Sequence, residues 1–243
     1  MKQTKTWFSE WFNTHYYHIL YKHRNHEEAK VFIENLTTFL DIPKTHTILD
    51  LACGKGRHSI FLNSLGYPVI GADLSENSIE YANQFANKNL KFVVQDMRKP
   101  FAVKVDAVFN MFTSFGYFDD DNDDIQVLKN IADALPKNGV AVIDYMNVSK
   151  VVPNLVAQET IHRDGLTFEI QRSVIDGFIT KQIDLTDAGK EFHFLERVKT
   201  IDLEKFKDYS VQSNLKIKHI FGDYNLSNYN KTTSDRLILI LSK

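Results

Sequence analysis

The sequence predicts an α/β protein in which a doubly wound, mostly parallel sheet is interrupted by an antiparallel β insertion. Two observations support this fold class. Short apolar runs alternate with segments of helical periodicity through residues 47–145, which is the pattern of successive β-α-β units. Turn-forming pairs then recur every 12 residues between residues 156 and 201, which is the pattern of an antiparallel meander.

The first β-α-β unit spans residues 47–73 and contains an acidic residue near the end of each strand. An apolar run closes in a turn at Gly54 and Gly56, and a helical segment follows. A right-handed crossover brings the carboxyl ends of two parallel strands together, so Asp50 and Asp73 are expected to share one crevice. Asp73 lies 19 residues after Gly54 (73 − 54). This spacing is near the ~20 residues expected for a ribose-binding carboxylate.

The glycine turn differs from a dinucleotide-binding turn in two respects. Ser59 stands where a third glycine is expected, and Asp50 lies just before the turn, where its charge would repel a pyrophosphate. A carboxylate at this position favours a cationic ligand. The stretch Asp50-Leu-Ala52-Cys-Gly54-Lys-Gly56 resembles motif I of the class I S-adenosylmethionine-dependent methyltransferases. Ala52 replaces the first glycine of the fuller pattern.

This resemblance implies a fold, a cofactor and a set of binding positions. The fold is a Rossmann-like, seven-stranded, mostly parallel sheet with an antiparallel final strand, and the helix-strand-loop-strand order of residues 203–241 agrees with it. The cofactor is S-adenosyl-L-methionine, with Asp73 holding the ribose and Asp96 and the Met97 amide placing the adenine. The implied cofactor-binding residues are Asp50, Ala52, Gly54, Gly56, Asp73, Leu74, Asp96, Met97, Asn110, Tyr21 and Arg24.

Residues 110–118 follow the fourth predicted strand and are expected to face the transferring methyl group. Family members that methylate bases or glutamine amides carry Asn/Asp-Pro-Pro-Tyr here, whereas this chain has Asn110-Met-Phe-Thr113. The aromatic and hydroxyl-bearing tip instead resembles the small-molecule N-methyltransferases, a branch that includes glycine and amino-sugar methylators. The candidate catalytic residues are Tyr117 in this tip and Tyr17, with His15, His18 and Tyr21 as further acid-base candidates.

Residues 1–46 are predicted to form an amino-terminal helical cap. The sequence is predicted to be helical from Glu10 to about Leu40 in two segments, a first that contains Trp11 to Leu20 and a second that contains Ala29 to Phe39. Related small-molecule methyltransferases lay a tyrosine-bearing helix over the cofactor, so the resemblance places this segment above the crevice. The guanidinium of Arg24 could pair with the carboxylate of the methionine moiety. A surface ion pair with Glu27 or Glu28 is the alternative.

Residues 119–124 contain five aspartates in six positions. The run lacks the loop glycine and distal glutamate of a calcium-binding loop. It precedes a segment of helical periodicity, and negative charge at a helix amino terminus is favoured by the helix dipole. The sequence therefore predicts a helix start here and no metal site.

The insertion at residues 151–201 is predicted to be a four-stranded antiparallel lobe. It separates the two parts of the methyltransferase core, residues 47–150 and 202–243. Phe168, Ile170 and Val174 mark one alternating face of its second strand. The lobe could serve as a lid, a substrate wall or a homodimer surface.

Bulk composition excludes several classes of partner. The formal net charge is −2, which disfavours a nucleic-acid backbone as ligand, and the single cysteine, Cys53, excludes an intrachain disulfide and a multi-thiolate zinc site. We expect a cytoplasmic protein without a membrane span, acting on a small-molecule methyl acceptor.

The predicted function is methyl transfer by in-line SN2 substitution to an amine or hydroxyl of a small molecule (EC 2.1.1.-). Two alternatives remain open. A non-catalytic nucleoside-binding or assembly module would use the β lobe for its contacts. A nicotinamide-dependent oxidoreductase would share the ribose-binding carboxylate, but its third glycine and a Tyr-x-x-x-Lys group do not occur in register.

Overall fold

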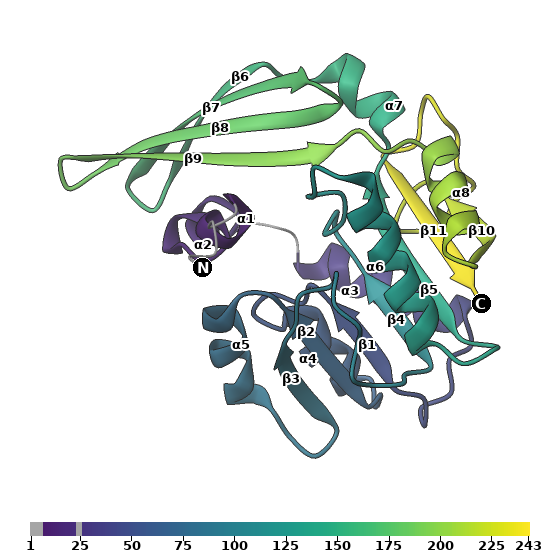
Figure 1. The fold of residues 1–243 in the computed structure, drawn as a ribbon. Coiled ribbons are helices and arrows are strands. Elements are labelled where there is room, and N and C mark those ends of the chain that lie inside the picture. Colours follow the sequence, from purple (N-terminus) through teal and green to yellow (C-terminus); the bar gives the residue numbers. More distant parts are fainter. Residues whose placement is uncertain (1–6, 23–25) are drawn as a thin grey trace.

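The computed structural model describes residues 7–22 and 26–243, and it contains two sheets that are joined by the chain but separate in space (Figure 1). The larger sheet has the strand order β10-β11-β5-β4-β1-β2-β3. Its strands are β1 (Ile48–Leu51), β2 (Val69–Asp73), β3 (Leu90–Val94), β4 (Ala107–Asn110), β5 (Val140–Met146), β10 (Lys216–Phe221) and β11 (Arg236–Ser242).

The first five strands are parallel, whereas β11 runs antiparallel to both β5 and β10. This arrangement confirms the predicted seven-stranded sheet with an antiparallel final strand. The crossovers place the carboxyl ends of β1, β2 and β4 side by side, with Asp50 paired to Gly71 and to Phe109 in register.

Helices cover both faces of this sheet, as the doubly wound prediction requires. One face packs against α6 (Asp121–Ala134) and α8 (Leu203–Gln212) through buried residues such as Leu128 and Phe206. The other face packs against α3 (His26–Phe39), α4 (Arg57–Ser64) and α5 (Glu76–Ala82). Successive strand residues alternate between the two cores: Leu49 and Val108 face α6, whereas Ile48 and Phe109 face α3 and α4.

The smaller sheet is the predicted antiparallel lobe, with the order β6-β7-β8-β9. Its strands are β6 (Gln158–Arg163), β7 (Leu166–Ile175), β8 (Phe178–Asp187) and β9 (Lys190–Lys199). Its three turns are centred on Asp164-Gly165, Asp176-Gly177 and Ala188-Gly189, and all six of these residues have positive φ. Tight turns of this kind match the right-handed twist of the strands that they join, which explains the regular 12-residue spacing.

The first of the two predicted helical segments, which contains Trp11, Tyr16 and Leu20, is divided into two short helices. It begins as α1 (Trp7–Trp11) and restarts as α2 (His15–Leu20), because the Thr14 side chain caps the new helix by accepting a hydrogen bond from the Tyr17 amide. Both short helices lie between the β lobe and the core (Figure 1). In contrast, α3 belongs to the core layer, so only part of residues 1–46 lies over the crevice.

The apolar face of the lobe is covered by these two short helices. Trp11, Tyr16 and Leu20 form a buried cluster with Phe168 and Ile170 of β7, and also with Ile183 and Leu185 of β8. Val174 shares the alternating face of Phe168 but is exposed. The short helix α7 (Val148–Val151) leads into the lobe. No helix within residues 7–22 and 26–243 is long and apolar enough to cross a membrane.

Candidate active site

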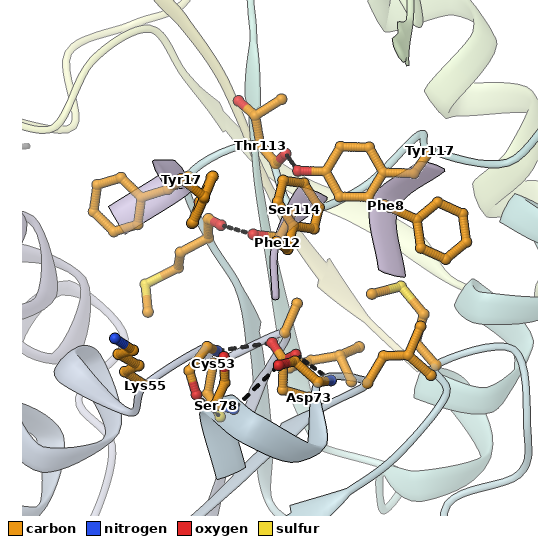
Figure 2. A pocket seen from close by; sticks show the side chains of 18 of the residues that line it. Phe8, Phe12, Tyr17, Cys53, Lys55, Asp73, Ser78, Thr113, Ser114 and Tyr117 are labelled. Atoms are coloured by element: carbon orange, nitrogen blue, oxygen red, sulfur yellow. Dashed lines mark hydrogen bonds between the residues drawn. The ribbon is translucent and has the colours of Figure 1, made fainter. Parts of the chain in front are cut away.

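A cavity of about 370 Å³ lies where the β1, β2 and β4 ends of the core meet the amino-terminal helices and the lobe. The size is within the range of small-molecule sites. Figure 2 shows Asp73 on one side of this cavity and the aromatic rings of Phe8, Phe12, Tyr17 and Tyr117 on the other. The core, the amino-terminal helices and the lobe therefore all contribute to its wall.

The turn after β1 brings backbone close to the cavity. Gly54 has φ +54° and lines the cavity, and a Cβ added to it would have no neighbour within 4 Å, so the space above it is open. Gly56 has φ +79°, but a Cβ there would lie 2.5 Å from the Phe92 ring. Gly56 is therefore required by packing at the start of α4, and it does not line the cavity.

Asp73 stands at the tip of β2 and is fixed by backbone amides. One carboxylate oxygen accepts a hydrogen bond from Gly54 N at 2.8 Å, and the other accepts one from Ser75 N at 2.8 Å. Burial nevertheless raises the pKa of Asp73 above its ordinary value. The predicted pairing of a glycine turn with a carboxylate 19 residues later is thus realised as direct contact.

Asp50 is buried behind the same turn with 2 % of its surface exposed. Its carboxylate accepts a hydrogen bond from Ser59 Oγ at 2.6 Å. Burial raises the pKa of Asp50 to about 6, and the neighbouring charge of Asp73 acts in the same direction although the Ser59 hydrogen bonds oppose it. Within the described residues, neither carboxylate forms an ion pair with a lysine or arginine. The arrangement therefore favours a ligand that brings positive charge.

Asp96 and Met97 lie beyond the end of β3 and also line the cavity. The Arg98 guanidinium donates to both carboxylate oxygens of Asp96, with Nη2 at 2.7 Å and Nε at 3.0 Å from its nearest acceptor. Although burial opposes its ionisation, these hydrogen bonds hold the pKa of Asp96 below its ordinary value. Asn130 on α6 donates to the Met97 carbonyl at 2.9 Å and fixes this loop from the core side.

The other end of the cavity is aromatic and includes both candidate catalytic tyrosines. Tyr117 packs edge-on against Trp7 with ring centroids 5.5 Å apart, and Phe12 contacts Tyr17 at 5.0 Å. The Tyr117 hydroxyl donates to the Thr113 carbonyl at 2.6 Å, an interaction that Figure 2 shows. This hydrogen bond engages the hydroxyl, so the ring of Tyr117 is the part that shapes the wall.

Three other predicted residues lie away from the cavity wall or outside the described chain. Asn110 is fully buried and donates to the Leu51 carbonyl at 3.0 Å, so it links β4 to β1. Tyr21 directs its hydroxyl to Glu196 at 2.8 Å, and therefore joins the amino-terminal helices to the lobe. Arg24 lies outside the described residues. The predicted residues that line the cavity are Asp50, Ala52, Gly54, Asp73, Leu74, Asp96, Met97, Tyr17, His18 and Tyr117.

Glu196, Val198 and Lys55 also line the cavity, but they were not predicted as cofactor or catalytic residues. Glu196 and Val198 enter from β9 of the lobe, where the alternation of β9 could have placed them on one face but not over the crevice. Lys55 and His18 lie near each other on the cavity wall, and burial together with the Lys55 charge lowers the pKa of His18 to about 4. His18 is consequently neutral near pH 7.

Comparisons with known proteins agree with this geometry. The sequence model of the family described as "Methyltransferase domain" matches residues 42–193. This chain belongs to that family. The chain is 27 % identical over 150 residues to glycine N-methyltransferase of Rattus norvegicus, an alignment that covers 54 % of this chain and 51 % of the relative. It thus spans about half the length of the first curated relatives that it matches.

One other relative and one solved structure match over more of their length. The dTDP-3-amino-3,4,6-trideoxy-alpha-D-glucopyranose N,N-dimethyltransferase of Streptomyces venezuelae is 25 % identical over 189 residues, covering 74 % of this chain and 79 % of the relative. An S-adenosylmethionine-dependent methyltransferase structure from Clostridium acetobutylicum superposes with a TM-score of 0.79 at 19 % identity, covering 93 % and 95 % of the two chains. The predicted family and fold are confirmed.

Proposed function

We propose that this protein transfers a methyl group from S-adenosylmethionine to an amine nitrogen of a small molecule. The observation that carries this proposal is the pair of carboxylates, Asp50 and Asp73, which line the cavity beside an open glycine turn and form no ion pair with a lysine or arginine of the described residues. Such a pair suits a ligand with a ribose and cationic groups, and S-adenosylmethionine carries both. When bound, it supplies a methyl group already activated on a sulfonium.

The residues at the strand ends would hold the cofactor. Asp73 would accept hydrogen bonds from the ribose hydroxyls, and Asp96 with the Met97 amide would hold the adenine. The Gly54 turn permits close approach of the methionine end, and Asp50 lies behind it to balance positive charge. The open space at Gly54 supports this fit, because a side chain at that position would fill the space that the methionine end of the cofactor needs.

The remainder of the cavity would align the acceptor and exclude water. Rings of Phe12, Tyr17 and Tyr117 enclose the end opposite Asp73 (Figure 2), and an aromatic face also attracts positive charge. Glu196 lines the lobe's side of the cavity, where its carboxylate is held by Trp11, Tyr21 and Lys181. A neutral amine then needs to lose only one proton after it gains the methyl group.

An amine is favoured over a hydroxyl because a hydroxyl acceptor needs a general base. The Tyr117 hydroxyl already donates to a carbonyl, and the pKa of His18 at about 4 makes its imidazole a weak base. The amino-sugar substrate named for the Streptomyces venezuelae relative supports the same choice.

The test has two stages. Calorimetry with S-adenosylmethionine, its demethylated product and the nicotinamide dinucleotides establishes the cofactor class, with micromolar binding expected for the first two only. Paired acceptors that differ only in carrying an amine or a hydroxyl at one carbon are then assayed by mass spectrometry for a gain of one methyl group. Binding of a nicotinamide dinucleotide alone would replace this proposal with an oxidoreductase.

We propose that the lobe acts as a wall of the acceptor site rather than only as an assembly surface, since Glu196 and Val198 reach the cavity. Homodimerisation through its outer face stays a prediction. Light scattering on the purified protein tests it, and a mass of one chain would exclude it.

A further inference from the structure

The turn that follows β4 has an unusual backbone. Phe112 and Thr113 are consecutive non-glycine residues with φ of +58° and +61°. Residues with a Cβ rarely adopt φ values in this left-handed region, and β-branched residues such as threonine are among the least suited to it. Both residues line the cavity. Strained conformations of this kind persist only where surrounding structure holds them, and they gather at functional sites.

Asp144 on β5 holds this turn from beneath. Its carboxylate accepts a hydrogen bond from Phe112 N at 2.7 Å, and its own carbonyl accepts one from Thr113 N at 3.0 Å. The Asp144 side chain is fully buried. On the cavity side, the Tyr117 hydroxyl donates to the Thr113 carbonyl at 2.6 Å. The two residues are thus fixed through both backbone amides and one carbonyl.

Arg236, at the start of the last strand β11, completes the arrangement. Its Nε donates to Asp144 Oδ1 at 2.7 Å, while Nη2 donates to Thr113 Oγ1 at 3.0 Å. One guanidinium therefore bridges the buried carboxylate and the hydroxyl of the strained residue. A lysine could neutralise Asp144, but its single ammonium lacks the planar fork that reaches both acceptors.

We propose that Asp144 and Arg236 form a positioning unit that keeps the Phe112–Thr113 turn in its left-handed conformation and thereby sets the acceptor wall. This rests on the proposed function, because the turn lies at the end of the cavity assigned to the acceptor. Neither Asp144 nor Arg236 lines the cavity, so both act through the turn. The contacts that hold Asp73 and Asp96 involve neither Asp144 nor Arg236. We therefore expect the unit to affect the acceptor end of the cavity and not the cofactor end.

The first test is Arg236→Lys, which keeps the charge and removes the fork. We expect kcat with an amine acceptor to fall at least tenfold while the dissociation constant for S-adenosylmethionine stays within twofold. The matched control is Arg172→Lys, because Arg172 pairs with Glu159 at 2.5 Å on the lobe and its side chain has the same 18 % exposure as Arg236. Equal kinetic effects in the two variants, or unchanged kcat in Arg236→Lys, would overturn the proposal.

A second pair of variants leaves the buried charges intact in case Arg236→Lys fails to fold. Thr113→Val removes the hydroxyl that Arg236 reaches, whereas Thr113→Ser retains it. We expect Thr113→Val to lower kcat at least threefold more than Thr113→Ser does. The opposite order, or no difference, would show that the Arg236 contact to this hydroxyl does not position the turn.

Hydrogen exchange separates failure of this inference from failure of the proposed function. If the wild-type protein methylates no amine, the proposed function is wrong, and the positioning unit is judged by amide exchange alone. Arg236→Lys should then accelerate exchange in the peptide containing residues 111–115 at least tenfold relative to Arg172→Lys. Unchanged exchange there would contradict the positioning role.

Discussion

Two groups of buried carboxylates in this chain have opposite surroundings. Asp50 faces the cavity, and Asp124 lies at the start of α6; burial raises the pKa of each to about 6. Asp124, however, receives a hydrogen bond from Lys199 Nζ at 2.6 Å, and the lysine side chain is only 5 % exposed. Asp50 has a serine hydroxyl as its partner instead.

The difference lies in the source of compensating charge. Lys199 comes from the end of β9, so the acidic run of residues 119–124 anchors the lobe to the core. Although burial opposes its charge, hydrogen bonds to Asp121 and Asp124 hold the pKa of Lys199 above its ordinary value. At the cavity, the charge of Arg57 favours the ionised form of Asp50, but no lysine or arginine of the described residues forms an ion pair with this carboxylate, so further compensating charge is left to a ligand. Burial of a carboxylate therefore does not identify a ligand-binding site by itself. A buried carboxylate that lacks an ion-pair partner in the protein does.

Lys199→Met should produce the largest effect on stability. Removing one partner of a buried ion pair leaves the other charge uncompensated, which costs about 3 kcal/mol or more in the free energy of unfolding. Urea denaturation measures this loss. Lys205→Met is the control, because Lys205 pairs with Asp121 at 2.8 Å but is 40 % exposed, and it should cost less than ~1 kcal/mol. Equal losses would remove the distinction between the two groups.

Asp73→Ala should have the largest effect on cofactor binding. The loss of charge-assisted hydrogen bonds is expected to weaken S-adenosylmethionine binding by at least ~1.5 kcal/mol, more than tenfold in affinity. Calorimetry measures it against Asp106→Asn, since Asp106 also accepts a backbone amide hydrogen bond, from Thr47 at 2.8 Å, but lies outside the cavity. Unaltered affinity in Asp73→Ala would refute the ribose assignment.

The pH dependence of S-adenosylmethionine binding tests the role of Asp50. The pKa of Asp50 is about 6 in the folded protein and 3.8 ordinarily, so the folded state holds more protons between these values. Without ligand, stability should therefore fall as pH rises through this window. A cationic ligand favours the ionised carboxylate, so its affinity should rise about tenfold from pH 5 to pH 7. Asp50→Asn should abolish that rise, and an unchanged slope in this variant would assign it to another group.

The smallest effect is expected for Asp119→Asn combined with Asp121→Asn. The Asp119 side chain is 80 % exposed and pairs with Arg197, and Asp121 is 46 % exposed. We expect methyl transfer to stay within twofold and unfolding to change by roughly 1 kcal/mol. A collapse of activity that depends on added metal would show that the acidic run binds a metal. The described residues contain no group of three or more histidine, cysteine, aspartate or glutamate side chains that is placed to hold a metal ion.

The sequence by itself determined those features that depend on local geometry. The Gly54 turn and Asp73 were predicted from their spacing because a β-α-β crossover has a nearly fixed length, and they meet at 2.8 Å. The lobe was equally predictable, since each turn pair adopts positive φ at both residues and thereby sets the strand register. The start of α6 at the acidic run followed from helix electrostatics.

Only the tertiary structure decided which polar groups compensate one another. Lys199 lies 75 residues from Asp124, and Arg236 lies 92 residues from Asp144 and 123 from Thr113. The same holds for Tyr21, which was predicted at the cofactor but contacts Glu196, 175 residues away. Sequence periodicity indicates that such residues are buried or polar, but pairing depends on how sheets and helices pack. A buried charge is compensated in space, by whatever the fold or the ligand places within hydrogen-bonding distance.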